Sequence, residues 1–289
     1  MGGTGVSTAG LDLDYSPSSL VPDLDVHLAR YAADSARARE TLPAHLDLPC
    51  GPLPEQRLDL FPAADPGAPL VVFVHGGYWQ ELSRSEAAFA AADFVAAGVS
   101  FAALGYGLAP GYGMRAITAM AADSVRRVCA GRARLPGAPS AVHLAGHSAG
   151  AHLVASALLD TAGWRAAGLD AAAEIASATL VSGVYALEPL TGTYVNDALG
   201  MDAAEARELS PLLRLTAGAA ALPPLVVARG ERETAAFGRQ QAEFAGAARA
   251  GGADVAELVV PGRHHFDLPF DLGRPDTALG AALARRIRG

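Results

Sequence analysis

Apolar and polar residues follow two different rhythms along the chain, and the rhythm changes near residue 70. Before that point, Leu24, Leu28 and Tyr31 recur at helical spacing after Asp23, which predicts a capped helix over residues 23–39. Residues 43–54 are rich in proline and predict a loop. Residues 55–61 (EQRLDLF) alternate polar and apolar positions, as a half-buried edge strand does.

From residue 70 onward, short apolar runs alternate with helical stretches. The runs predict buried strands at residues 70–75, 99–104, 141–145, 178–181, 225–228 and 258–260, and the stretches between and after them predict helices near 86–97, 114–130, 149–159, 234–250 and 277–287. Strands alternating with helices indicate an α/β fold whose mostly parallel central sheet has helices on both faces. In such sheets the functional residues lie at the carboxyl ends of the strands.

The domain organisation follows from the same pattern. We predict a single α/β domain over residues 21–289. Within it, residues 185–221 contain no clear strand and predict a small cap segment over the site. Residues 1–20 are rich in glycine, serine and threonine, which predicts a mobile N-terminal tail.

Composition and charge exclude several functions. The 289 residues carry a formal net charge of −8 and contain no lysine, which argues against a nucleic-acid partner and excludes a lysine Schiff base. The two cysteines, Cys50 and Cys129, and the scattered histidines show no metal-ligand spacing, so we expect neither a metal nor an organic cofactor. Without a recognisable signal or membrane span, we expect a cytoplasmic protein with a small-molecule substrate and no membrane partner. A homodimer is possible, and the sequence does not decide the oligomeric state.

A nucleophile motif lies where one predicted strand ends and a helix begins. Residues 146–150 read Gly-His-Ser-Ala-Gly, and strand–turn–helix is the context that the G-x-S-x-G motif requires. The sharp turn leaves no room for side chains at Gly146 and Gly150, and it projects Ser148 into the cleft. The N–H of Ala149, at the start of the helix, then faces a developing oxyanion.

A second motif follows the predicted strand at residues 70–75. Residues 75–79 read His-Gly-Gly-Tyr-Trp, which matches the glycine-rich loop that completes an oxyanion hole. We therefore predict that the N–H groups of Gly77 and Tyr78 join Ala149 as oxyanion donors, and that His75 braces the loop. Trp79 suits an aromatic wall for the substrate or a place in the core, and the sequence does not decide between the two.

The acid and the base of a catalytic triad are expected after the nucleophile, in that order. His264 and His265 follow the last predicted strand, and either suits the base; we prefer His265 because Phe266 can anchor its loop. Near the end of strand 225–228, Glu231 and Glu233 are both candidates for the acid, and spacing alone does not choose between them. Together these motifs predict an α/β-hydrolase fold.

Several segments resemble the eukaryotic-type kynurenine formamidases. They are HGGYWQ (75–80), GHSAGAHL (146–153), VSGVYALEPL (181–190), TYVNDALGM (193–201) and SPL (210–212). In that family the acid precedes a serine or threonine in a segment that ends Phe-x-Arg-Gln, as Glu233 does here, and the base directly precedes a phenylalanine, as His265 does. The resemblance therefore implies a Ser148–Glu233–His265 triad, with glutamate where some members have aspartate. Residues before about 69 carry no such motif.

The resemblance also implies an activity. Ser148 is expected to attack an aryl formamide such as N-formylkynurenine, in tryptophan catabolism, through a formyl-enzyme intermediate. Tyr194 and Asn196 are expected either to contact the substrate or to form a local hydrogen-bond network in the cap. The alternatives are a carboxylesterase or deacylase, a tailoring enzyme that performs acyl transfer or cyclisation, and a non-catalytic ligand-binding hydrolase fold.

Overall fold

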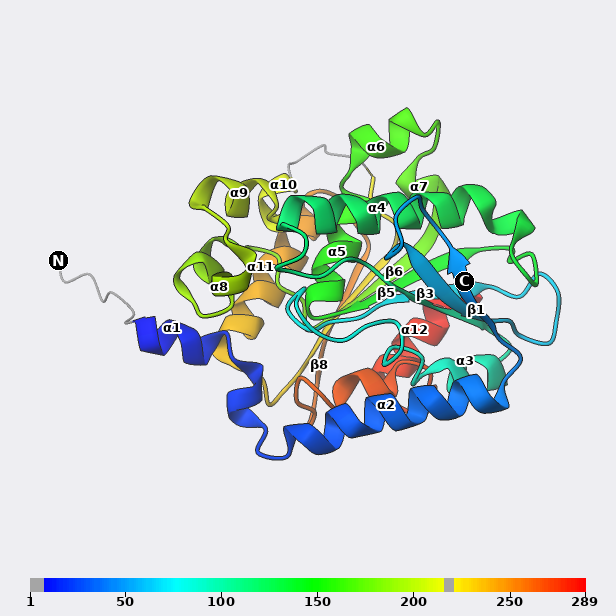
Figure 1. Cartoon of the computed structure of the whole chain (residues 1–289), viewed down its shortest axis with the longest axis horizontal. Helices are drawn as coiled ribbons and strands as arrows, with labels where there is room; N and C mark the ends of the chain where they lie inside the picture. The colour runs from blue at the N-terminus through cyan, green and yellow to red at the C-terminus, as the bar shows by residue number, and fades with distance from the viewer. Residues whose placement is uncertain (1–7, 216–220) are drawn as a thin grey trace.

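The computed structural model describes residues 8–215 and 221–289, and its centre is one eight-stranded sheet (Figure 1). The strand order is β1-β2-β4-β3-β5-β6-β7-β8. The strands are β1 (His45–Pro49), β2 (Arg57–Phe61), β3 (Leu70–Val74), β4 (Ser100–Leu104), β5 (Val142–His147), β6 (Ile175–Val181), β7 (Leu225–Gly230) and β8 (Val255–Val260). Strands β3 to β8 pair in parallel, whereas β1 and β2 pair antiparallel to their neighbours. The predicted mostly parallel α/β sheet is therefore confirmed.

Helices cover both faces of the sheet (Figure 1). One face carries α4 (Met114–Gly131), α5 (Ala149–Leu158) and α11 (Ala235–Ala250), and the other carries α2 (Leu24–Thr41), α3 (Ala91–Ala96) and α12 (Ala278–Arg288). The shorter helical elements are α1 (Thr8–Asp14), η1 (Pro17–Leu20), η2 (Arg132–Arg134), α6 (Thr161–Ala166), α7 (Ala171–Glu174), η3 (Glu188–Gly192), α8 (Asn196–Leu199), α9 (Ala203–Glu208), α10 (Pro211–Arg214) and η4 (Leu268–Asp271). In the described ranges, no helix combines the length and apolar character that a membrane crossing requires.

The continuous apolar runs arise because the central strands are buried on both sides. Along β3, Leu70, Val72 and Val74 belong to the core under α4, α5 and α11, whereas Val71 and Phe73 belong to the core under α2, α3 and α12. Successive side chains of a strand point to opposite faces, so a strand covered twice needs apolar residues at every position. This double burial holds the carboxyl ends of β3 and β5 side by side.

Two local predictions were wrong. Strand β2 does not form the edge of the sheet: β1, inside the predicted loop 43–54, pairs with it on the outer side. Asp59 of β2 is consequently buried, and it is accommodated because Arg39 and Arg84 both form ion pairs with its carboxylate.

The helix predicted over residues 86–97 begins only at Ala91. The hydroxyl of Ser83 bonds to the backbone N–H of Ser85 and to the carboxylate of Glu86. These local bonds compete with helix formation, and residues 84–86 form a turn.

The N-terminal residues also differ from the expectation of a mobile tail over 1–20. Residues 1–7 lie outside the described residues, but α1 and η1 are helical, and Tyr15 and Pro17 are buried. The cap predicted over 185–221 contains η3, α8, α9 and α10, and its residues 216–220 lie outside the described residues. The described part of the cap and α1 lie next to each other in Figure 1, at one end of the sheet.

Four buried histidines predict how stability depends on pH. Burial lowers the pKa of His75, His143 and His152 to about 4, and lowers the pKa of His147 well below its ordinary value. An unfolded histidine titrates near 6.5, so between pH 6.5 and pH 4 the unfolded chain binds more protons than the folded one. Stability that is complete above pH 6.5 is therefore lost as the pH falls toward 4.

We expect the free energy of unfolding in urea to fall between pH 7 and pH 5 by about 2 kcal/mol for each such histidine. His143, whose Nδ1 lies 2.8 Å from Ser177 Oγ, offers the clean control. His143→Gln retains a polar partner for Ser177 but cannot titrate. Between pH 7 and pH 5, the free energy of unfolding of this variant should therefore fall by about 2 kcal/mol less than that of the wild type. An unchanged pH slope in this variant would contradict the interpretation.

Candidate active site

Ser148 lies on a strained turn between β5 and α5. Its backbone has φ +54°, a left-handed conformation that costs energy for a residue with a side chain. The turn is tight: a Cβ on Gly146 would lie 2.5 Å from the carbonyl oxygen of Gly150, and a Cβ on Gly150 would lie 2.0 Å from that of Val74. Only glycine fits at both positions. The turn therefore presents Ser148 to the cavity that it lines.

Three backbone N–H groups near Ser148 are free to bind an anion. Gly76 approaches Ser148 so closely that a Cβ on it would lie 3.1 Å from the serine Cβ, and Gly77 and Tyr78 follow with φ +98° and +47°. Among the described residues, no acceptor bonds to the N–H of Gly77, Tyr78 or Ala149, the first residue of α5. Free backbone N–H groups of this kind can stabilise a tetrahedral oxyanion.

His75 and Tyr106 brace this loop. The Tyr106 hydroxyl donates to the carbonyl oxygens of His75 and Gly76, at 3.0 and 3.2 Å. The two rings stack with centroids 4.3 Å apart, and His75 Nδ1 donates to the carbonyl oxygen of Gly76 at 2.8 Å. His75 is buried beneath the loop, as a bracing residue must be.

His265 and Glu233 form a buried acid–base pair. The Nδ1–H of His265 donates to Glu233 Oε2 at 3.0 Å, and Glu233 Oε1 accepts from Ser182 Oγ at 2.6 Å and from the Gly230 N–H at 2.7 Å. Burial alone would raise the pKa of Glu233, but the imidazole of His265 and these hydrogen bonds outweigh it and lower the pKa. Glu233 is therefore a carboxylate that can orient the imidazole and stabilise its protonated form.

The other two candidates point elsewhere. Glu231 accepts a hydrogen bond from the Gly262 N–H at 2.9 Å on the surface. His264 turns toward Asp267, with Nε2 3.5 Å from its carboxylate, and packs edge-on against the ring of His27. The motifs did not decide between Glu231 and Glu233 as the acid, or between His264 and His265 as the base. The structure brings Glu233 and His265 together.

Two hydrogen bonds hold consecutive carbonyl groups of the loop that carries His265 and Phe266, here called the base loop. His147 Nε2–H donates to the carbonyl oxygen of His265 at 2.9 Å, and the Tyr31 hydroxyl donates to that of Phe266 at 2.6 Å. Both rings are buried, and Tyr31 stacks on Phe270 with centroids 4.7 Å apart. The loop that carries the imidazole is therefore fixed from α2 and from the nucleophile turn at once.

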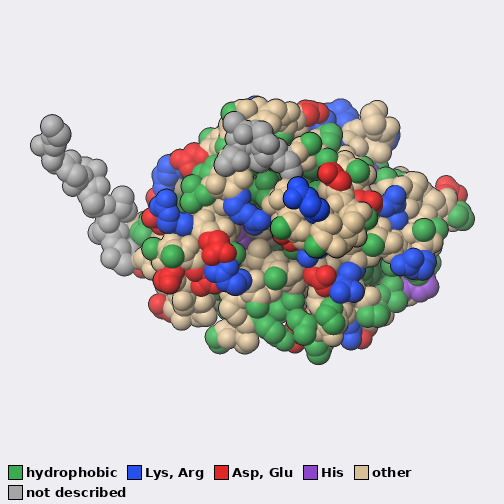
Figure 2. Space-filling view, turned by 90° about the horizontal axis from the view of Figure 1, so that it is seen from above, with side chains coloured by type: hydrophobic (Ala, Val, Ile, Leu, Met, Phe, Trp, Pro, Cys, Tyr) green, Lys and Arg blue, Asp and Glu red, His purple; other side chains and the backbone are tan. Residues whose placement is uncertain are grey.

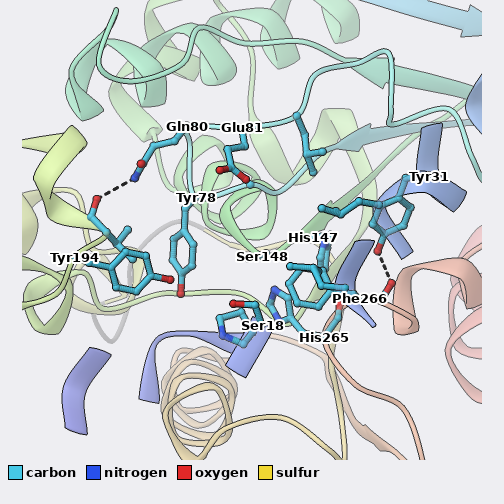
Figure 3. Close-up of a pocket in the computed structure, with 16 residues that line it drawn as sticks. Ser18, Tyr31, Tyr78, Gln80, Glu81, His147, Ser148, Tyr194, His265 and Phe266 are labelled. Carbon is cyan, nitrogen blue, oxygen red and sulfur yellow. Dashed lines mark hydrogen bonds between the residues drawn. The ribbon is translucent and has the colours of Figure 1, made fainter. Parts of the chain in front are cut away.

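Ser148 and His265 line one cavity of about 270 Å³ (Figure 3). Among the described residues, no hydrogen bond joins Ser148 Oγ to His265. In unliganded hydrolases this contact is often long and shortens when substrate binds. The arrangement can therefore deprotonate the serine once a carbonyl group occupies the cavity.

The N-terminal segment forms one wall of this cavity, which the sequence did not suggest. The lining residues from this segment are Pro17, Ser18, Leu24, Leu28 and Tyr31. Several hydrogen bonds hold the segment, among them those that Tyr78 Oη donates to the Tyr15 carbonyl at 2.6 Å, Thr234 Oγ1 to the Asp14 carbonyl at 2.5 Å, and the Tyr194 N–H to Asp12 Oδ1 at 2.9 Å. The apolar face read as Leu24, Leu28 and Tyr31 thus faces the cavity rather than the core alone.

Sequence reasoning also missed Ser182. It directly follows β6, has φ +52°, and donates its hydroxyl to the buried carboxylate of Glu233. Its N–H bonds to the carbonyl of Ala228 at 2.7 Å, which ties it to the end of β7. The only signal was the position of a serine at the carboxyl end of a strand.

The three expected substrate contacts have different positions. Trp79 is fully buried, packs edge-on against His152, and does not line the cavity; Tyr78 occupies the wall instead. Asn196 bonds through its side chain to both backbone groups of Met201, at 3.0 and 2.9 Å, so it forms the local network that was the alternative. Tyr194 does line the cavity and is 48% exposed.

The face of the molecule that Figure 2 shows carries charged side chains of both signs. Within the described residues, no three histidine, cysteine or acidic side chains are placed to hold a metal ion.

Comparisons with known proteins identify relatives of this chain. A family model described as the alpha/beta hydrolase family matches residues 71–282. Kynurenine formamidase of Danio rerio is 33% identical over 269 residues, which cover 89% of each chain. Isoprenylcysteine alpha-carbonyl methylesterase of Arabidopsis thaliana is 29% identical over 75% of this chain and 55% of its own length. A solved structure from Silicibacter sp. tm1040, provisionally described as a thioesterase, superposes with a TM-score of 0.81 at 28% identity, covering 95% of this chain and 98% of that one.

The acid assignment can be tested by a matched pair of variants. Glu233→Gln retains the shape but loses the charge beside His265, so we expect hydrolysis of a test substrate to fall about 10³–10⁴-fold in kcat. Glu231→Gln removes the same charge from a surface position and should leave kcat within about twofold of wild type. The reverse outcome would transfer the role of the acid to Glu231.

Tyr31→Phe tests how the base loop is held. The variant keeps the ring stacked on Phe270 but leaves the Phe266 carbonyl without its donor, so we expect kcat to fall about tenfold with KM nearly unchanged. Tyr112→Phe removes a hydroxyl from a tyrosine that does not line the cavity and serves as the control. A Tyr31→Phe enzyme with wild-type kcat would show that the bond does not position His265.

Proposed function

The chain belongs to the alpha/beta hydrolase family, among its kynurenine formamidase-like members, and on this premise we propose that it is a serine hydrolase that cleaves an aryl formamide such as N-formylkynurenine. The observation that carries the proposal is the buried Glu233–His265 pair, whose histidine lines the same cavity as Ser148 and as Gly77 and Tyr78 beside it. Membership of the family supports a hydrolase of small-molecule amides or esters. That Ser148 is the nucleophile, that it acts in a triad and that the substrate is a formamide are our proposal.

In the first step, Ser148 Oγ attacks the formyl carbon and its proton passes to His265 Nε2. The carbonyl oxygen takes up the electron pair and becomes an oxyanion, which accepts hydrogen bonds from the N–H groups of Gly77, Tyr78 and Ala149. The carboxylate of Glu233 stabilises the imidazolium that forms. Each backbone donor contributes about 3 kcal/mol to the barrier reduction.

In the second step, the tetrahedral intermediate collapses. His265 gives its proton to the aryl nitrogen, the C–N bond breaks, and the arylamine leaves a formyl ester on Ser148. Water, deprotonated by His265, then attacks this ester and releases formate and the free serine. A cavity of about 270 Å³ holds a single aromatic ring with a short substituent.

The second candidate is an esterase. It is favoured by the similarity to the Arabidopsis thaliana methylesterase, because the same triad can cleave an ester by the same steps as an amide. Acyl transfer and cyclisation use the same serine ester but exclude water from the second step.

The experiment compares hydrolysis of N-formyl-L-kynurenine with that of p-nitrophenyl acetate. We expect a preference for the formamide in kcat/KM, and Ser148→Ala should lower kcat on both substrates by at least about 10⁴-fold. Ser124→Ala, at a buried serine on α4, is the control and should retain activity. Ester cleavage without formamide cleavage would favour the esterase, and full activity in Ser148→Ala would exclude the serine mechanism.

A further inference from the structure

Glu81 brings an uncompensated carboxylate to the cavity. It is one of the lining residues, it is exposed, and among the described residues neither a hydrogen bond nor an ion pair reaches its side chain. Figure 3 shows it on the same side of the cavity as Tyr78 and Gln80. Other acidic side chains close to the cavity are engaged: Glu233 bonds to His265, and Asp12 accepts a bond from the Tyr194 N–H.

The backbone that carries this carboxylate is fixed against the oxyanion loop. The N–H groups of Gln80 and Glu81 both donate to the carbonyl oxygen of Gly77, each at 2.9 Å. A Cβ on Gly77 would lie 2.2 Å from the carbonyl oxygen of Glu81, so the two residues are in close contact. The negative charge consequently lies within a few residues of the N–H groups that are expected to hold an oxyanion.

A negative charge in this place opposes the proposed chemistry unless something balances it. It repels the oxyanion that forms on the substrate, and the chain offers no lysine to neutralise it. The lining residues from the described chain include no arginine. A substrate that brings its own cation removes the repulsion and gains an ion pair at the same time.

We propose that Glu81 is a specificity-determining residue that binds an ammonium group on the leaving-group side of the substrate. The preferred substrates are then aryl formamides whose ring carries an aliphatic amine, with any carboxylate directed away from Glu81 toward solvent. The inference rests on the proposed function and adds which group of the substrate is recognised, and by which residue.

The test varies the charge on both partners. The substrates are formanilide, which is neutral, and the decarboxylated analogue of N-formylkynurenine, which keeps the ammonium group. For Glu81→Gln we expect kcat/KM on the cationic formamide to fall about tenfold, mostly through KM, while kcat/KM on formanilide stays equal or rises. Raising the ionic strength should weaken the preference of the wild-type enzyme in the same direction.

Two further variants sharpen the result. Glu86→Gln removes the same charge from the same loop at a residue that does not line the cavity. It should leave kcat/KM unchanged for both substrates. Glu81→Arg should reverse the order of kcat/KM, so that a formanilide bearing a carboxylate is cleaved with a higher kcat/KM than the cationic formamide. Equal changes for cationic and neutral substrates in Glu81→Gln would overturn the inference.

The failure of the proposed function would look different. If the wild-type enzyme cleaves esters but neither formamide, the formamide proposal falls, and the same comparison is made with phenyl acetate and its aminoethyl-substituted analogue. A loss confined to the cationic ester in Glu81→Gln would then support the role of Glu81. Equal kcat/KM changes on the two esters would overturn it.

Discussion

The close contact between the start of α5 and the end of β3 is the constraint on which the site depends. Gly150 lies so near the Val74 carbonyl that no side chain fits between them. This contact forces the chain to turn sharply at Ser148, and the cost of its positive φ is met by the packing of two adjacent, doubly buried strands. The same contact brings the loop after β3 beside the serine. The proposed nucleophile and the free N–H groups beside it are thus placed by one packing interaction.

The acid–base pair shows how a charge is kept where water is excluded. Glu233 has no exposed side-chain surface, yet each carboxylate oxygen has a partner, and the partners come from three different strand ends. Such a charge would be costly alone, but satisfied on all sides it becomes a fixed part of the electrostatic field. The consequence is an imidazole whose orientation is set before any substrate arrives.

The sequence predicted those parts of the molecule that are determined locally. The apolar runs located six strands because double burial demands apolar residues throughout, and the glycines around Ser148 located the turn because their spacing is steric. Strand β1 was not predicted because it is the exposed edge strand, so it carries no continuous apolar run, and because it lies in a proline-rich stretch. The contact between Tyr31 and Phe266 was missed because it joins residues distant in sequence, and so was Ser182, whose hydroxyl matters only because Glu233 lies opposite. Trp79 could not be assigned because core and wall positions favour the same residue type.

The link between Tyr31 and Phe266 spans 235 positions of the chain, and that between Tyr15 and Gln240 spans 225. The cavity therefore takes its walls from segments that lie far apart in the sequence, with Pro17 to Tyr31 on one side and His265 and Phe266 on the other. An emerging chain can pair β3, β4 and β5 and form the nucleophile turn, yet it has no complete cavity until the base loop has been synthesised. On the proposed mechanism, Ser148 is in this way kept apart from His265 during translation, and hydrolytic activity becomes a report on completed folding.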